Sequence, residues 1–192
     1  MKSEDDWSRL VQSIDKIRLE EMNRKLPENL LAYLVAGEDH RFWLHFGFDP
    51  IGLLRAAWNS KIHNRREGGS TIAMQLVRVV TGNYELSLKR KLNEIYLATR
   101  LTLYLERSEI LKLYLSIAYY GWDMHGISKA CKHLNLNKDA LNDFEAASLV
   151  ARLKYPEPRY FNDHKNKKIK IRAIHIINRF NKLNSVGQYG TI

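Results

Sequence analysis

The sequence predicts a mostly α-helical domain. Segments in which apolar residues recur at helical spacing follow one another along most of the chain, and strand-like alternation is rare. Several of these segments begin at a residue that can cap a helix. We find no internal repeat and no low-complexity linker, so the 192 residues are most simply one domain.

Caps and breakers predict the order of the elements. Proline suits the first helical position because its missing amide would have no partner there, and serine or asparagine accepts a hydrogen bond from a free amide of the first turn. The predicted helices are "PIGLLRAAWNSKI" after Asp49, "TIAMQLVRVV" after Ser70, "LKRKLNEIYLATRLTLYL" after Ser87, "EILKLYLSIAYY" from Ser108 to its end at Gly121, and "FEAASLVARL" after Asn142, whose partner Glu145 gives a capping box. We expect a polar helical segment over residues 1–25, the main domain over 26–183 and a loosely held tail over 184–192.

The composition describes a folded basic protein. A net charge of +10 with 45% apolar residues favours an anionic partner: nucleic acid, an anionic membrane surface or a phosphorylated substrate. The only cysteine, Cys131, excludes an intramolecular disulfide and the paired-cysteine zinc and redox motifs. The longest uncharged stretches are about half as long as a membrane-spanning helix, and the first residues lack the apolar core of a signal peptide. We therefore expect either a cytoplasmic protein or an anchor that lies outside this chain.

Glu38 lies on an apolar helical stripe. The apolar residues before it recur at helical spacing, and the same spacing leads through Glu38 to Phe42 and His45, whereas Asp39 points about 100° away. Burial disfavours a charged carboxylate, so such a glutamate needs a cationic partner or binds its proton tightly, as a general acid or base does. The alternative is a helix-end glutamate paired with Arg41 or a nearby lysine.

A second carboxylate, Glu94, stands at the start of a long apolar run. Arg90 precedes it by one turn and Lys91 by three residues. Cations in this arrangement can bind a phosphate. They can equally form an ordinary surface ion pair, which contributes roughly a few tenths of a kcal/mol.

The stretch "REGGSTIAMQLVR" combines glycines with a helix start. The glycines allow close backbone approach, and the free amides of the following helix form an anion site. Thr71, Gln75 and Arg78 then lie along one polar face about 10 Å long, which could hold a diphosphate. The alternative is a glycine hinge followed by an N-cap.

In this order, these segments resemble the five motifs of the peptidoglycan glycosyltransferases, glycosyltransferase family 51. That domain occurs in bifunctional penicillin-binding proteins and in monofunctional biosynthetic transglycosylases. The matching residues are Glu38, Asp39, Phe42, His45, Gly47 and Asp49 in the first motif, Gly68, Gly69, Ser70, Thr71, Ile72 and Gln75 in the second, Arg90, Lys91 and Glu94 in the third, "RSEILKLYL" in the fourth, and "HGISKACKHLNLNKDALNDFEAASLVARLKYPEPRYF" in the fifth. The similarity extends from about Leu26 to about Phe180.

The sequence departs from the family pattern at several positions. Arg78 and Arg107 stand where the family usually has lysine, which keeps the charge and changes its geometry. Met74 replaces a second glutamine, and Val79 and Ser116 replace asparagines. These departures keep open a weakly active or degenerate homologue that binds lipid-linked precursors without turnover.

The resemblance implies that the chain polymerises lipid II into β-1,4 glycan strands. The 4-hydroxyl of an acceptor N-acetylglucosamine attacks the anomeric carbon of the growing chain, and undecaprenyl pyrophosphate leaves with inversion. The catalytic residues are then Glu38, the base, and Glu94, which organises the cations and the donor. The implied substrate-binding residues are Asp39, Phe42, His45, Gly69, Ser70, Thr71, Gln75, Arg78, Arg90, Lys91 and Arg107. No tightly bound cofactor is implied, but a divalent cation, Mg²⁺ or Mn²⁺, accompanies the substrate pyrophosphate in family members.

The resemblance also implies a lysozyme-like helical lobe with a small membrane-facing jaw lobe, at about residues 50–67. In this segment Ile51, Leu54, Trp58 and Ile62 follow helical spacing among arginines and lysines, which is typical of an interfacial helix. A core-packed amphipathic helix is the alternative. We expect Leu54 and Trp58 to face the membrane.

The partners implied by the family are lipid II, the growing glycan strand, the membrane surface and other cell-wall synthesis proteins, with no nucleic acid. The implied location is the outer face of the bacterial inner membrane, and the absence of a following transpeptidase segment favours the monofunctional kind. Two other functions compete: a lysozyme-like enzyme that cleaves peptidoglycan, and a basic nucleic-acid-binding module. The glycine-rich anion site argues against the first, and the scattered basic residues argue against the second.

Overall fold

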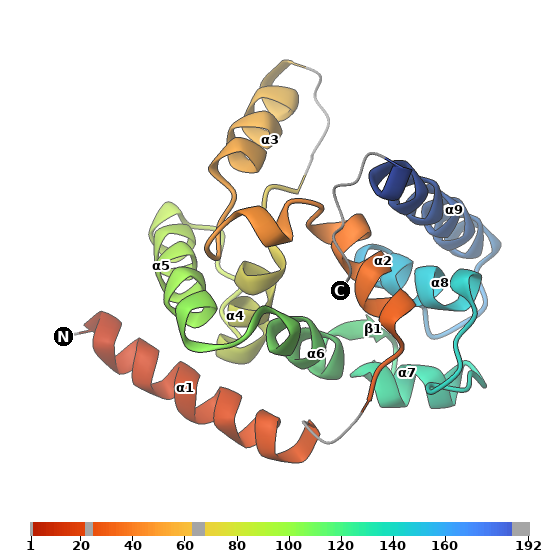
Figure 1. Cartoon of the computed structure of the whole chain (residues 1–192), viewed down its shortest axis with the longest axis horizontal. Coiled ribbons are helices and arrows are strands. Elements are labelled where there is room, and N and C mark those ends of the chain that lie inside the picture. The colour runs from red at the N-terminus through yellow and green to blue at the C-terminus, as the bar shows by residue number, and fades with distance from the viewer. Residues whose placement is uncertain (1, 22–24, 63–67, 186–192) are drawn as a thin grey trace. The chain divides into compact units, whose positions relative to one another are not determined.

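The computed structural model describes residues 2–21, 25–62 and 68–185. It confirms the mostly α-helical fold class (Figure 1). The elements in chain order are α1 (Lys2–Glu21), α2 (Glu28–Glu38), the short 3₁₀ helix η1 (Phe42–Leu44), α3 (Pro50–Ile62), α4 (Ile72–Thr81), α5 (Leu88–Tyr104), α6 (Arg107–Ile117), β1 (Tyr119–Gly121), β2 (Met124–His125), α7 (Ile127–His133), α8 (Asp143–Lys154) and α9 (Asp163–Ser185).

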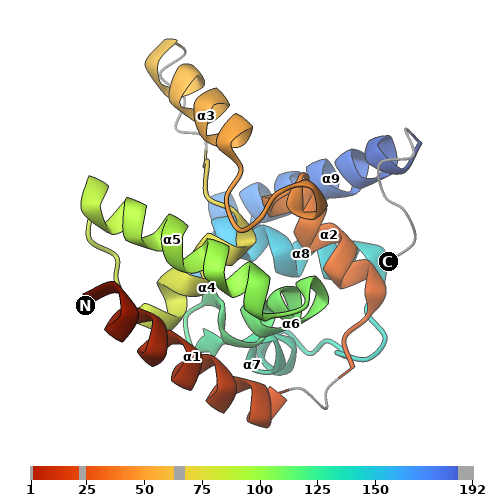
Figure 2. The same ribbon diagram turned by 60° about the vertical axis from the view of Figure 1, so that its left-hand side comes forward.

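The chain divides into two compact units, of which the first combines residues 1–20 with 41–114. Within it, α4 packs along α5. The helix α1 buries Leu10 and Ile14 and is also held by polar contacts, such as Arg100 Nη1 to Glu4 Oε1 at 2.6 Å. In both views of the ribbon, α3 stands clear of the other helices of this unit (Figures 1 and 2).

The second unit combines residues 21–40 with 115–192, and its core lies between α2, α8 and α9. The ring of Tyr33 meets that of Phe180 edge-on, with centroids 5.1 Å apart. The predicted capping box at the start of α8 is confirmed, because Asn142 and Glu145 bond each other's backbone amides. The predicted cap of α5 by Ser87 is confirmed as well.

The predicted cap of α4 is wrong by one residue. Thr71, not Ser70, is the N-cap, and its Oγ1 accepts a hydrogen bond from Met74 N at 3.2 Å. The hydroxyl of Ser70 instead accepts hydrogen bonds from Arg78 and Lys91. Serine and threonine both cap helices, so the sequence pattern alone does not decide between two adjacent residues of these types.

The predicted end of α6 is also wrong. This helix begins at Arg107 and ends at Ile117, and the residues expected to continue it form β1, which pairs antiparallel with β2. After β2, Gly126 leads the chain into α7; its φ of +82° suits glycine, and its amide donates to Ala118 O at 2.8 Å. A Cβ there would lie 2.2 Å from Ser116 O, so a side chain is excluded.

The predicted continuation of the helical stripe past Glu38 is wrong too. The helix α2 ends at Glu38, and the backbone of Asp39 is not helical, with φ of −154° and ψ of 71°. Asp39 is therefore not turned to an exposed helix face: it is only 6% exposed. The carbonyl of Gly37, which a continuing helix would bond to a later amide, accepts from Arg172 instead.

Part of the predicted organisation falls on residues that the structure does not describe. Residues 186–192 of the expected tail and residues 63–67 of the expected jaw lie outside the described ranges. The boundaries that we assigned to the main domain and the jaw stay predictions. Among the described helices, none is both long enough and apolar enough to cross a membrane.

Candidate active site

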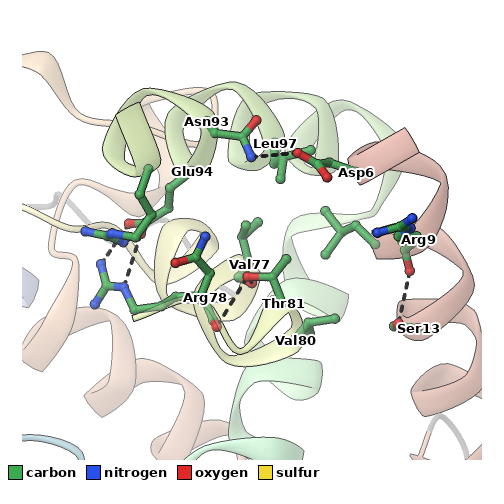
Figure 3. Close-up of a pocket in the computed structure, with 13 residues that line it drawn as sticks. Asp6, Arg9, Ser13, Val77, Arg78, Val80, Thr81, Asn93, Glu94 and Leu97 are labelled. Atoms are coloured by element: carbon green, nitrogen blue, oxygen red, sulfur yellow. Dashed lines mark hydrogen bonds and ion pairs between the residues drawn. The ribbon is translucent and has the colours of Figure 1, made fainter. Parts of the chain in front are cut away.

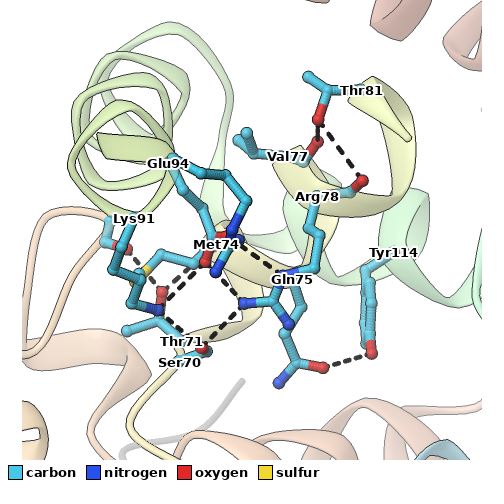
Figure 4. Close-up of polar contacts among 12 residues, drawn as sticks. Ser70, Thr71, Met74, Gln75, Val77, Arg78, Thr81, Lys91, Glu94 and Tyr114 are labelled. Carbon is cyan, nitrogen blue, oxygen red and sulfur yellow. Dashed lines mark hydrogen bonds and ion pairs between the residues drawn. The ribbon is translucent and has the colours of Figure 1, made fainter. Parts of the chain in front are cut away.

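The centre of the polar site in the first unit is Glu94, which is 3% exposed. Arg78 from α4 contacts both carboxylate oxygens, with Nη2 2.7 Å from Oε1 and Nε 3.1 Å from Oε2. Lys91 Nζ lies 3.2 Å from Oε1, and Arg90 donates to Oε2. Figure 4 shows Arg78 and Lys91 reaching the carboxylate from two helices. In the described part of the chain this Glu94 cluster, of three cations and one carboxylate, has a net charge of +2.

The surroundings of Glu94 favour its ionised form. Burial alone would raise the pKa of Glu94, but the hydrogen bonds and charges of Arg78 and Lys91 outweigh burial, and the pKa is lowered. The pKa of Lys91 is lowered as well, chiefly by burial, against the opposing charge of Glu94. Glu94 is therefore a weak proton acceptor near neutral pH, and it is suited to holding cations in place.

Ser70 connects the cations of the Glu94 cluster. Its Oγ accepts from Arg78 Nη2 at 3.0 Å and from Lys91 Nζ at 2.9 Å (Figure 4). The neighbouring Gly69 allows close approach to α3, because a Cβ there would lie 3.1 Å from Leu53 Cδ2. The glycine-serine stretch thus brings a hydroxyl to the two cations.

The three residues expected to form one polar face of α4 contact different partners. Thr71 is buried, and its hydroxyl donates to Gly47 O at 2.6 Å, so its one donor is used within the protein. Gln75 Oε1 accepts from Tyr114 Oη at 2.5 Å. Of the three residues predicted to share this face, Arg78 contacts Glu94.

The first-motif residues Phe42 and His45 are packed inside the first unit rather than exposed. They are 1% and 6% exposed, and their rings meet edge-on with centroids 6.3 Å apart. Arg107 lies over the rings of Phe42 and Phe46 and donates to the carbonyl of Phe42. Contacts of this kind show how Arg107, predicted to bind substrate, fixes the segment that follows Glu38.

Glu38 belongs to the second unit and has a cationic partner. Its side chain is 14% exposed, and its Oε1 lies 3.4 Å from Arg172 Nη2. The alternative partner Arg41 instead pairs with Asp49, Nε to Oδ2, at 3.2 Å. Sequence reasoning missed Arg172, although a signal exists: Arg172 falls on a stripe with the buried residues Ile169 and Ile176 of α9.

A cavity of about 290 Å³ lies beside the Glu94 cluster within the first unit. Arg78, Arg90 and Glu94 line it together with residues of α1, among them Asp6 and Arg9 (Figure 3). The cavity beside the cluster is therefore lined by α1 as well as by α4 and α5, which the sequence did not predict. No group of three histidine, cysteine, aspartate or glutamate side chains that could hold a metal occurs among the described residues.

Comparison with known proteins shows the same similarity over most of the chain. A family model described as "Transglycosylase" matches residues 8–181. Penicillin-binding protein 1A of Rickettsia prowazekii is 32% identical over 80% of this chain and 20% of its own length. Penicillin-binding protein 1A of Aquifex aeolicus is 36% identical over 69% of this chain and 18% of its own.

A shorter relative is the monofunctional glycosyltransferase of Staphylococcus saprophyticus. It is 32% identical over 67% of this chain and 51% of its own length. The chain thus spans about a fifth of the penicillin-binding proteins and about half of this shorter relative.

Proposed function

Since this chain belongs to the transglycosylase family, we propose that it is a peptidoglycan glycosyltransferase that polymerises lipid II and releases undecaprenyl pyrophosphate. The observation that carries the proposal is the Glu94 cluster. Among the described residues, the cluster carries a net charge of +2 on two helices, and Ser70 lies between two of its cations. This charge suits an anionic pyrophosphate. Such preorganised donors stabilise charge as it develops on a leaving group.

One hydrogen-bond donor of the Glu94 cluster is left for a ligand. The Nε atom of Arg90 is buried and has no hydrogen-bond partner in the described part of the protein. Buried donors are nearly always bonded, and those that are not commonly mark a place for a ligand or water. We assign this donor, with Arg78 and Lys91, to the donor pyrophosphate.

Glu38 takes the role of general base. It removes the proton from the acceptor 4-hydroxyl as the new bond from that oxygen to the anomeric carbon forms. The bond from the anomeric carbon to the phosphate oxygen breaks, and the pyrophosphate leaves with the electron pair. A single inverting displacement needs a base on the acceptor and no covalent nucleophile.

Two departures from the family pattern have local explanations. Met74, where the family has a second glutamine, is fully buried and packs in the core, so a side chain at this position does not face a ligand here. Arg78, where the family has lysine, contacts both oxygens of Glu94 and also Ser70, which a single ammonium group does less well. These contacts favour an active enzyme over a degenerate one.

Removing a cation of the Glu94 cluster should weaken donor binding. Charge-assisted hydrogen bonds contribute about 1.5–3 kcal/mol, so Arg78→Ala or Arg90→Ala should raise the Kd for lipid II by roughly tenfold or more. Binding of detergent-solubilised lipid II to each variant measures the effect. Arg100→Ala is the matched control, because Arg100 lies on the same helix as Arg90 but pairs with the exposed Glu4. Equal losses in all three variants would show that overall charge, and not this cluster, governs binding.

The reaction itself distinguishes the proposal from peptidoglycan cleavage. Wild-type protein incubated with lipid II should give a ladder of glycan strands on a gel, and the phosphoglycolipid inhibitor moenomycin should abolish it. Release of muropeptides from purified peptidoglycan, with no polymer from lipid II, would establish a hydrolase instead.

We further propose that α3 contacts the membrane surface. Ile51, Leu54 and Trp58 lie at helical spacing and are 55%, 73% and 66% exposed, which argues against the core-packed alternative. Arg55, between them, is exposed as well. Exposed apolar side chains with adjacent cations suit an interface with anionic lipids.

Adding negative charge to α3 should release the protein from lipid. The double variant Leu54→Glu with Trp58→Glu should lose most binding to anionic liposomes in a sedimentation assay, with helical content unchanged. Leu19→Glu with Leu103→Glu is the control, because it adds the same charge at leucines that are 86% and 72% exposed elsewhere. If the two double variants bind liposomes alike, α3 is not the contact.

A further inference from the structure

Arg172 connects α9 to the end of α2, where Glu38 lies. Its Nη2 donates to Gly37 O at 2.6 Å and lies 3.4 Å from Glu38 Oε1. The two side chains are 16% and 14% exposed, so the pair is largely shielded from water. One nitrogen therefore contacts both the peptide before Glu38 and its carboxylate.

Close packing fixes the backbone at the same point. A Cβ on Gly37 would lie 3.0 Å from Val150 Cγ1 and 3.2 Å from Ile176 Cδ1, so α2 approaches α8 and α9 about as closely as glycine permits. The last carbonyls of a helix have no intrahelical partner, and Arg172 supplies one for Gly37. The backbone that carries Glu38 is thus held by packing and by a hydrogen bond.

The charge of Arg172 serves a different purpose from its hydrogen bond. Glu38 is the last residue of α2, where the helix dipole places partial negative charge and disfavours a carboxylate. A neutral donor could bond Gly37 O, but only a cation compensates the carboxylate.

We propose that Arg172 is the positioning residue of the general base: it holds the Glu38 carboxylate in the orientation that accepts the proton of the acceptor hydroxyl. The inference rests on the proposed function, because it assigns Arg172 a role through Glu38. It predicts a loss in turnover without a loss in substrate binding, since the cations of the Glu94 cluster are untouched.

Three variants separate the charge of Arg172 from its hydrogen bond. Arg172→Lys keeps the charge, Arg172→Gln keeps a donor without charge, and Arg172→Met keeps neither. A misplaced catalytic group can lower the rate of a reaction about 10²-fold. The Gln and Met variants should therefore lower kcat by at least tenfold, whereas the Lys variant should keep most of the wild-type kcat. The KM for lipid II should change less than twofold in all three.

Arg152→Met is the control for a general loss of stability, because Arg152 forms a similarly buried ion pair with Glu157 in the same unit. It should melt at a temperature close to that of Arg172→Met but retain turnover. If Arg172→Met does not fold, the Lys and Gln variants still decide. Wild-type turnover in Arg172→Gln, or equal losses in the Lys and Gln variants, would overturn the positioning role alone. Wild-type protein that makes no glycan strands would overturn the proposed function, and this inference with it.

Discussion

Replacing Glu38 by glutamine is expected to lower the rate of lipid II polymerisation by about 10²-fold or more. Glutamine preserves the size of the side chain and can still accept a hydrogen bond, but it cannot take a proton. Because the cations of the Glu94 cluster remain, the Kd for lipid II should stay within about twofold of wild type, well under the tenfold that corresponds to 1.4 kcal/mol. Single-turnover polymerisation, followed by gel, measures the chemical step directly.

The same helix offers a matched control for Glu38→Gln. Glu28, the first residue of α2, is exposed, so Glu28→Gln makes the same chemical change away from the buried end. This variant should polymerise lipid II at the wild-type rate. Glycan synthesis by Glu38→Gln at a near-normal rate would exclude Glu38 as the base. Glu94 would then have to be reconsidered, although its lowered pKa makes it a weak acceptor.

Local spacing explains why the sequence predicted part of this site. Arg90, Lys91 and Glu94 lie within one turn of α5, so their contact follows from helical geometry alone. The capping box of α8 is local in the same way. Interactions between residues within about four positions of each other on one helix can be predicted from the sequence pattern, because the helix fixes the relative positions of the side chains.

Long-range partners could not be derived in this way. The pattern placed Thr71, Gln75 and Arg78 on one face, but Thr71 bonds Gly47 and Gln75 bonds Tyr114, each far away in sequence. Helical periodicity fixes which residues share a face and leaves open what that face meets.

The partner of Glu38 was missed for a related reason. Arg172 is 134 residues away, and its position on the buried stripe of α9 shows only that some carboxylate or carbonyl must meet it. The identity of that group depends on how α9 packs on α2. Tertiary packing also decided where α2 ends, since Arg172 bonds the Gly37 carbonyl that a longer helix would use.

Replacing Glu94 by glutamine is expected to lower the free energy of unfolding by about 3 kcal/mol, because it removes the buried carboxylate that compensates three half-buried cations. Arg78, Arg90 and Lys91 would then repel one another at close range. Denaturant unfolding, compared by linear extrapolation, measures the change. Polymerisation should fall by about 10²-fold as well, since displacement of the cations by about 1 Å is enough to cause such a loss.

The stability cost of Glu94→Gln should depend on pH. The folded pKa of Glu94 is lowered, so its contribution to stability is fully present above the unfolded value of about 4.3 and is lost as pH falls through the folded pKa. The difference in the free energy of unfolding between wild type and variant should therefore be constant near neutral pH. It should shrink once the pH drops below about 4.

Glu109→Gln provides the comparison that tests the cluster as a unit. Glu109 is 6% exposed and also belongs to the first unit, but the cation that it pairs with, Arg18, is 40% exposed on its side chain. Because water can solvate Arg18 once its partner is lost, we expect a cost of about 1 kcal/mol. Similar losses of stability in Glu94→Gln and Glu109→Gln would mean that the Glu94 cations rearrange to reach solvent. The cluster would then lack the rigidity that a preorganised pyrophosphate site requires.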